Sequence, residues 1–206
     1  VPDRQQAILD HLREKHSASV SELSRKFFVS ETSVRRDLAR LERSGFIRKT
    51  YGGAIWLEGG NTVLSLEARQ QTEKEAKSLI ARKAAERICN GDVIFLDSSS
   101  TALAMVPYLE GLTSLSVITH GLKIAVELAA YPQIRVYCIG GLMAPKLYSC
   151  SGSLACRMLE GMRADRFFVS PRAVTEGLGI YCANEEEATL RRMMLERSEE
   201  TVLLLN

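Results

Sequence analysis

From residue 76 onward, short apolar runs alternate with stretches of helical periodicity. The strand-like apolar runs cover residues 92–97, 115–118, 134–139, 166–170 and 201–205. The helix-like stretches cover residues 75–89, 101–109, 121–130, 152–161 and 184–197. Such alternation favours a mainly parallel sheet, because two parallel neighbouring strands have to be joined by a crossover connection, which is usually a helix. The sequence therefore predicts a Rossmann-like α/β domain over residues 76–206.

The first 57 residues follow a different pattern. Residues 3–15 place their apolar side chains on one face, as in an amphipathic helix. The capping box Ser19–Glu22 predicts a second helix, and Ser30 is placed to cap a third after a tight turn. Two β-prone runs around Gly52-Gly53 predict a hairpin. Three short helices followed by a hairpin predict a winged helix-turn-helix domain, mostly α, over residues 1–57.

Residues 58–75 lose both periodicities and gain glycine and charge, so we expect a linker there. The chain begins with Val1 rather than Met and stops directly after its last strand-like run. We therefore expect the α/β domain, residues 76–206, to be truncated at its C-terminal end.

Composition narrows the class of protein. Hydrophobic residues make up 46% and charged residues 25%, which is ordinary for globular domains. No apolar run approaches the length of a membrane span, so no membrane partner is expected. The five cysteines form no C-x-x-C pair, which indicates reduced thiols in a cytoplasmic protein. With three histidines and no ligand spacing, neither a metal nor another cofactor is expected.

Charge is distributed unevenly along the chain. The net charge is only +2, but residues 1–58 hold eleven basic against eight acidic side chains. In a helix-turn-helix the second helix of the pair lies in the major groove of double-stranded DNA, where Arg can grip guanine. The candidate DNA-binding residues are Ser30, Thr32, Ser33, Arg35, Arg36, Arg40, Arg43, Arg48, Lys49 and Tyr51. A plain helical bundle with a solvated basic face is the alternative, but the order of caps, turn and wing favours DNA binding.

A second constellation follows the first strand of the α/β domain. The strand ends in Asp97, and Ser98, Ser99, Ser100 and Thr101 lead into a helix. Free backbone N–H groups, the helix dipole and the hydroxyls can hold a phosphate at the carboxyl end of a strand. Alternatively, these Ser and Thr side chains only cap the helix.

Further candidates for the same cleft each carry a structural alternative. His120 follows a strand and either contacts a ligand or caps a helix. Arg191 either binds phosphate or pairs with Glu187, and the ion pair is favoured. The glycines let a backbone approach a ligand or simply form turns. The acidic residues fit helix capping better. The remaining candidate effector-binding residues are Gly141, Gly152, Arg172, Asn184 and Glu186.

The motifs together resemble DeoR-type bacterial regulators. Residues 19–54, with Ser30-Glu31, the run from Val34 to Leu38 and Gly52-Gly53-Ala54, are similar to the DNA-binding domain of that family. Residues 76–205 resemble its sensor domain, including 91–101, 117–119, 140–141, 151–155 and 184–188. The family often has Gly at position 28, His at 51, Asn at 120 and Lys at 191.

The resemblance implies a sensor related in fold to sugar-phosphate isomerases, with a phosphorylated sugar or related metabolite as effector. It implies a repressor, here of carbohydrate-metabolism genes. Because helix-turn-helix regulators usually bind paired half-sites, we expect a homo-oligomer, either a dimer or a tetramer. Two other functions remain open: a sugar-phosphate isomerase-like enzyme, and a DNA-binding protein whose α/β domain only oligomerises. The turn at Ser170-Pro171-Arg172 has no Asp or Glu, whereas isomerisation needs a positioned base, so we expect no catalytic residue.

Overall fold

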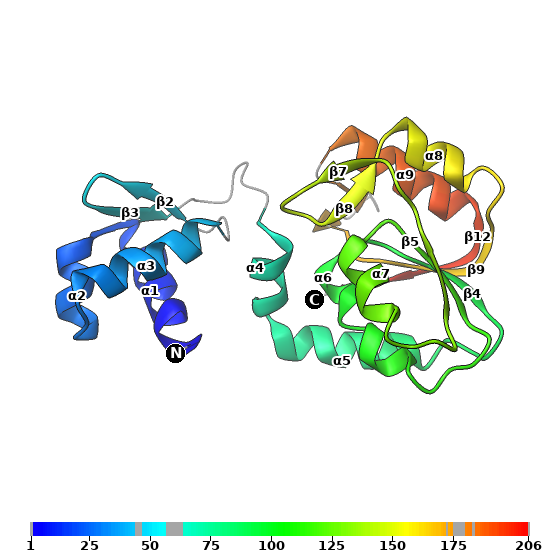
Figure 1. The fold of residues 1–206 in the computed structure, drawn as a ribbon, viewed down its shortest axis with the longest axis horizontal. Coiled ribbons are helices and arrows are strands. Elements are labelled where there is room, and N and C mark those ends of the chain that lie inside the picture. The colour runs from blue at the N-terminus through cyan, green and yellow to red at the C-terminus, as the bar shows by residue number, and fades with distance from the viewer. Residues whose placement is uncertain are drawn as a thin grey trace. The chain divides into compact units, whose positions relative to one another are not determined.

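The computed structural model describes residues 2–43, 47–56, 64–171, 173–174, 180–182 and 184–205. The chain divides into two compact units, Val1–Arg69 and Gln70–Asn206 (Figure 1). Each unit has its own buried core, so each is described by itself.

The N-terminal unit contains three helices and a small antiparallel sheet. Its elements are α1 (Pro2–Lys15), β1 (Ser17–Ser19), α2 (Val20–Phe27), α3 (Glu31–Arg43), β2 (Ile47–Thr50) and β3 (Gly53–Trp56). The sheet order is β1-β3-β2, so the predicted hairpin has a third strand that the sequence did not suggest. Gly53 is needed where β3 pairs with β1, because a Cβ there would lie 2.2 Å from the carbonyl oxygen of Ala18.

Both predicted helix caps of this unit are present. Ser19 Oγ accepts a hydrogen bond from the Glu22 backbone N–H at 3.1 Å, and Ser30 Oγ accepts one from that of Ser33 at 3.3 Å. Side chains from all three helices and β2 meet in one core, whose members include Ile8, Leu12, Leu23, Val34, Leu38, Leu41 and Ile47. The predicted C-terminal Gly45 of the third helix lies outside the described residues.

The C-terminal unit is a parallel α/β domain. Its main strands are β4 (Val93–Leu96), β5 (Ser116–Thr119), β6 (Arg135–Cys138), β9 (Ala164–Val169) and β12 (Ser198–Leu203). Its helices are α5 (Lys74–Ala85), α6 (Ser100–Leu103), α7 (Leu122–Leu128), α8 (Ser153–Leu159) and α9 (Glu185–Glu196). All five predicted strands are found, in the order β12-β9-β4-β5-β6, and every pairing among them is parallel.

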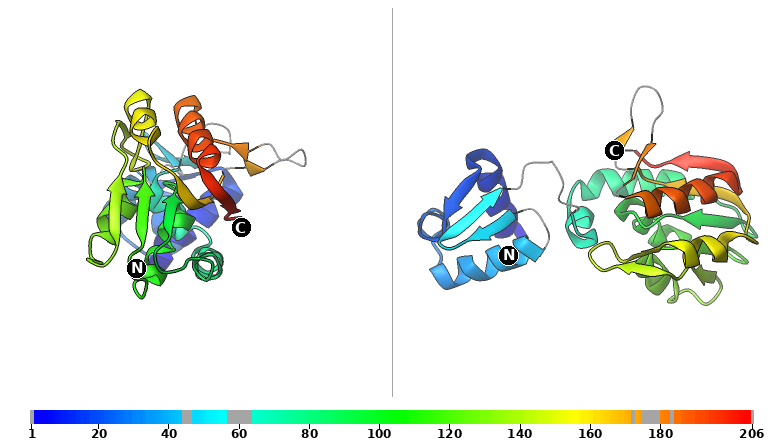
Figure 2. Two further views of the ribbon diagram at one scale, coloured as in Figure 1. Left: turned by 90° about the vertical axis from the view of Figure 1, so that its right-hand side faces the viewer. Right: turned by 90° about the horizontal axis from the view of Figure 1, so that it is seen from above.

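Helices cover both faces of this sheet. Figures 1 and 2 show α5, α6 and α7 on one face and α8 and α9 on the other. The alternation along β4 fits this arrangement, because Phe95 joins Leu159 and Met194 in the core beneath α8 and α9. The neighbours of β4 are β5 on one side and β9 on the other, so the strand order reverses at β4. In open α/β sheets, ligands bind outside the carboxyl ends of the strands at such a switch point.

Several predicted boundaries need correction. The stretch 101–109 is not one helix: α6 ends at Leu103, and a separate 3-10 turn covers Val106–Leu109, with Pro107 near its start. Residues 58–75 are not all linker, because Leu66–Gln71 form helix α4 and α5 already begins at Lys74. Two short hairpins were not predicted, β7 (Leu142–Ala144) with β8 (Ser149–Ser151) and β10 (Ala173–Val174) with β11 (Ile180–Tyr181). Strands this short carry little periodic signal.

Candidate functional site

Helix α3 separates a buried face from a basic, exposed one. Val34, Leu38 and Leu41 are buried in the core of the N-terminal unit. Thr32 and Arg36 are four residues apart and both exposed, so they share a stripe on the opposite face. Arg36 forms no ion pair or hydrogen bond with the described residues, whereas Arg35 pairs with Glu31 at 3.0 Å on the surface. The exposed stripe is therefore the part of this unit best placed to meet a ligand.

The other candidates for DNA contact also lie at the surface. Ser30, Arg40, Arg48, Lys49 and Tyr51 are exposed, and Ser33 is half-buried. The side chain of Arg43 lies outside the described residues. Tyr51 is fully exposed in the turn between β2 and β3. The exposed groups thus come from α3, from its cap and from the wing.

Two contacts that the sequence analysis missed fix α3 and the wing in place. Asp37, on the inner side of α3, is 2% exposed and accepts hydrogen bonds from Arg4 Nε at 2.8 Å and Gln5 Nε2 at 3.1 Å. The carboxylate of Glu42 accepts a hydrogen bond from the Lys49 backbone N–H at 2.8 Å. A charged residue on the apolar side of a helix was the available signal for Asp37, since a buried carboxylate needs partners.

At the switch point of the C-terminal sheet, Asp97 joins the ends of β4 and β9. Its side chain is completely buried. Oδ1 accepts a hydrogen bond from the Ser99 backbone N–H at 2.9 Å, and Oδ2 accepts one from that of Ser170 at 3.0 Å. Asp97 therefore shapes the turn after β4 and holds it beside the end of β9.

Arg191 of α9 completes this cluster. Its Nη2 lies 3.2 Å from Asp97 Oδ2 and 3.0 Å from Glu187 Oε1, so the expected ion pair with Glu187 is present. Burial lowers the pKa of Arg191, but the two carboxylates outweigh this effect and raise it, so the guanidinium is charged. Nε of Arg191 is buried and has no hydrogen-bond partner among the described residues.

The four hydroxyls after Asp97 divide into different roles. Ser99 Oγ caps α6 by accepting from the Ala102 N–H at 3.0 Å, as the structural alternative proposed. Ser98 Oγ donates to Glu187 at 3.4 Å, and the Thr101 hydroxyl accepts from Ser170 Oγ at 3.4 Å. The Ser100 hydroxyl bonds to no described residue. Since α6 has only four residues, its dipole is small, and hydroxyls and charged side chains dominate the site.

His120 follows β5 and is completely buried beside this cluster. Neither ring nitrogen has a hydrogen-bond partner among the residues described. Burial lowers the pKa of His120 to about 4, with help from the positive charge of Arg191, and Asp97 and Glu187 offset only part of this. The helix-capping alternative is not what the structure contains, because the residue at the N-cap of α7 is Gly121 and no side chain caps it.

The remaining predicted residues flank this cluster or lie elsewhere. Asn184 caps α9 by accepting from the Glu187 N–H at 2.8 Å, and Glu186 accepts from Ser151 Oγ at 3.2 Å. Gly141 has φ +142°, and a Cβ there would lie 2.4 Å from the Ser151 carbonyl oxygen, so its role as a tight turn is sufficient to explain it. Gly152 and Glu186 line a groove of about 560 Å³ between α8 and α9. Arg172 lies outside the described residues.

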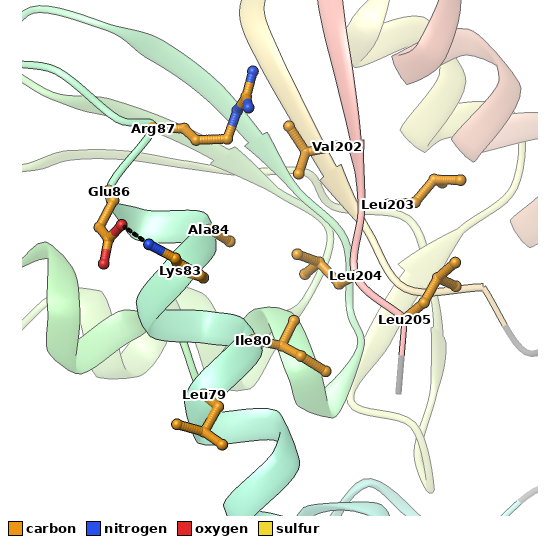
Figure 3. Close-up of a pocket in the computed structure, with 10 residues that line it drawn as sticks. All are labelled: Leu79, Ile80, Lys83, Ala84, Glu86, Arg87, Val202, Leu203, Leu204 and Leu205. Atoms are coloured by element: carbon orange, nitrogen blue, oxygen red, sulfur yellow. Dashed lines mark hydrogen bonds and ion pairs between the residues drawn. The ribbon is translucent and has the colours of Figure 1, made fainter.

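A larger groove lies between α5 and the edge strand β12. It has a volume of about 750 Å³, and Figure 3 shows Leu79, Ile80 and Leu204 among its mainly aliphatic walls. Its charged residues are Lys83, Glu86 and Arg87. Lys83 pairs with Glu86 at 2.8 Å, and Arg87 pairs with Glu200 of β12. None of the predicted effector-binding residues lines this groove, so it is separate from the cluster around Asp97.

Two other classes of site were also sought in the described part of the chain. No three His, Cys, Asp or Glu side chains there are grouped so as to hold a metal ion. Among the helices that the structure describes, none is both long and apolar enough to cross a bilayer.

A winged helix-turn-helix followed by an α/β domain with a buried polar cluster at its switch point defines a DNA-binding regulator with a sensor domain. The chain belongs to the DeoR family of transcriptional regulators. Residues 4–59 match the DeoR-like helix-turn-helix domain, and residues 72–206 match the DeoR C-terminal sensor domain. The predicted fold class and family are thereby confirmed.

Individual relatives match along almost the whole chain. The HTH-type transcriptional regulator GolR of Listeria innocua is 36% identical, covering 99% of this chain and 80% of the relative. The HTH-type transcriptional repressor GlcR of Bacillus subtilis is 30% identical, covering 98% and 78%. Among solved structures, ribose 5-phosphate isomerase A from Neisseria gonorrhoeae is 16% identical over 66% of this chain and 55% of that chain, with a TM-score of 0.48. A likeness this distant says nothing about activity.

Proposed function

We propose that this regulator is a repressor whose affinity for operator DNA is controlled by a phosphorylated sugar or related metabolite bound at the Asp97–Arg191 cluster. One observation carries the effector site. Three buried polar atoms, His120 Nδ1, His120 Nε2 and Arg191 Nε, lack partners among the described residues at the switch point where α/β sheets bind ligands. Buried polar groups are nearly always paired, so a cluster of unpaired ones is a functional feature.

The chemistry of the cluster fits a ligand with both anionic and hydroxyl groups. Arg191 offers Nε in addition to Nη2, the nitrogen that it uses for both Asp97 and Glu187. The Ser100 hydroxyl can donate to a phosphate oxygen, and His120 can exchange a hydrogen bond with a sugar hydroxyl. A phosphorylated sugar carries both kinds of group, which supports it as the effector class.

Binding without turnover fits the state of the carboxylates. Both acidic side chains of the cluster, Asp97 and Glu187, are held by Arg191, and Asp97 also accepts two backbone hydrogen bonds. A general base must be free to reach the proton that it abstracts. We therefore propose a sensor rather than an isomerase, and the site residues act by binding alone.

On the DNA side, we propose that Thr32, Arg35 and Arg36 of α3 read base edges in the major groove. The neighbouring groups at the cap of α3, at its C-terminal end and on the wing then meet the phosphates. They are Ser30, Ser33, Arg40, Arg43, Arg48, Lys49 and Tyr51. Because helix-turn-helix regulators read paired half-sites, the active form is a homo-oligomer. The effector changes DNA affinity by preferring one state of that assembly.

The first experiment is a thermal-shift screen of the chain against phosphorylated sugars, with the unphosphorylated sugars as controls. We expect one phosphorylated compound to raise the melting temperature in a saturable way. Arg191→Met should abolish the shift. Arg166→Met is the matched control, because Arg166 also pairs with two carboxylates, Asp92 at 2.6 Å and Glu200 at 3.1 Å, away from the site.

The compound is then added to operator DNA and the chain, and to the chain alone. The proposal is supported if the compound changes the DNA affinity of the native chain and of Arg166→Met, but not that of Arg191→Met. Conversion of the compound, followed by NMR, would instead support the isomerase alternative. Absence of any shift across the screen contradicts a phosphorylated-sugar sensor and favours a domain that only oligomerises.

A further inference from the structure

The ring of His120 is the least satisfied polar group of the proposed effector site. Its main chain is fixed, because the His120 carbonyl accepts a hydrogen bond from the Cys150 N–H at 2.9 Å. Its side chain is 0% exposed, and both ring nitrogens lack partners among the described residues. A neutral imidazole needs one acceptor and one donor, and an imidazolium needs two acceptors. Whatever binds beside His120 therefore decides which form is stable.

The charged groups that face the ring come from two elements. Asp97 lies at the end of β4, and Glu187 and Arg191 lie on α9. From β8, Cys150 is a neutral thiol, since burial raises its pKa. With His120 neutral, two carboxylates and one guanidinium give the cluster a formal charge of −1.

This charge is the wrong sign for the proposed ligand. A phosphate monoester carries about −1.5 to −2 at neutral pH, so it meets a cluster that is already negative in a site of low dielectric. Arg191 cannot turn fully to the phosphate without leaving Asp97 and Glu187 unpaired. His120 is the group in the cluster that can gain a positive charge without breaking a hydrogen bond present in the structure.

We propose that the anionic group of the effector binds together with a proton that His120 takes up, so that effector binding is coupled to pH. This inference rests on the proposed function and adds to it the regulation of the same site. The proton is supplied by water, and no covalent bond to the ligand forms. Imidazolium N–H groups then donate to the bound anion, and the net charge of the protein cluster becomes zero.

The sign of the pH dependence follows from linkage. Free His120 has a pKa of about 4 and is neutral at pH 6 to 8. An anion raises that pKa in the complex, so the complex holds more protons than the free protein. The association constant therefore rises as pH falls, by up to about tenfold per pH unit for one proton.

The test compares the native chain with His120→Asn, whose amide keeps a donor and an acceptor but cannot be protonated. Isothermal titration in buffers of different ionisation enthalpy counts the protons taken up. The probes are inorganic phosphate and the phosphorylated sugar that raises the melting temperature. Any proton uptake that remains in His120→Asn belongs to the ligand itself. His16→Asn, in the N-terminal unit, is the matched control.

For each ligand bound, we expect the native chain and His16→Asn to take up close to one more proton than His120→Asn takes up. NMR of the three histidine rings should show the His120 signal, absent from His120→Asn, changing from neutral to imidazolium when the probe is added at pH 6. A bound ligand with equal proton uptake in all three chains overturns this inference and leaves the sensor proposal standing. If neither inorganic phosphate nor any phosphorylated sugar binds, the sensor proposal fails, and this inference fails with it.

Discussion

Arg191 Nη2 lies 3.2 Å from Asp97 Oδ2, which ties helix α9 to the end of strand β4 inside the C-terminal unit. Both side chains are buried, and Glu187 shares the same guanidinium nitrogen at 3.0 Å. Two carboxylates can remain buried here because one arginine, two backbone N–H groups and the Ser98 hydroxyl compensate them. The stability of the unit and the charge of the site are therefore set by the same residue.

We predict that Arg191→Met lowers the free energy of unfolding of the C-terminal unit by about 3–5 kcal/mol, because it leaves buried carboxylates unpaired. Arg166→Met should cost only about 1 kcal/mol, since its ion pairs are partly exposed and screened by solvent. Urea unfolding followed by circular dichroism measures both. A deficit no larger than that of Arg166→Met contradicts this account.

The sequence predicted the elements of this site better than the contacts within it. Five strands and the turn after Asp97 were predictable, because strand alternation and helix caps are local signals. Local patterns also suggested Arg191–Glu187, which are four residues apart. The pairing of Arg191 with Asp97 joins residues far apart in the sequence, so no local pattern contained it.

In the N-terminal unit, too, local features were predictable and long-range contacts were not. Caps at Ser19 and Ser30 were predicted, whereas the contact of Asp37 with Arg4 was not. Strand β1 is three residues long, too short for a periodic pattern, and it forms only because β3 offers it an edge.

Asp37→Ala should destabilise the N-terminal unit by about 1.5–3 kcal/mol, because it removes hydrogen bonds to a buried charged group. The single tryptophan, Trp56, packs against the core of this unit, so its fluorescence follows the unfolding of this unit in urea. Glu31→Ala is the control, since its ion pair with Arg35 is exposed and should contribute less than about 0.5 kcal/mol. Equal effects of the two substitutions would mean that Asp37 does not hold α3 against α1.

Phe28→Gly should stabilise the N-terminal unit by about 0.5–1 kcal/mol. The substitution relieves the strain of the left-handed conformation, and the greater conformational freedom of glycine in the unfolded chain offsets part of that gain. Phe28 is the C-cap of α2 with φ 52° and ψ 43°, and its side chain is 94% exposed, so little packing is lost. The glycine that the family often carries at position 28 has no Cβ and adopts this conformation without strain. The same Trp56 fluorescence measures the change, with Phe28→Ala as control, since alanine keeps the strain. A gain in Phe28→Ala as large as in Phe28→Gly would show that strain is not the cause.

Arg35 and Arg36, which are adjacent in α3, should differ in how they contribute to DNA binding. Arg36 is unpaired among the described residues, whereas Arg35 has to leave Glu31, which costs about 0.3–0.5 kcal/mol. On an operator selected from random duplexes, Arg36→Ala should cost about 1–3 kcal/mol if that guanidinium reads a base, with little loss on random DNA. Arg48→Ala, on the wing, should weaken both DNAs alike and reduce the salt dependence by about one counterion. If Arg36→Ala instead weakens operator and random DNA equally, Arg36 contacts phosphate, and base reading falls to other residues of α3.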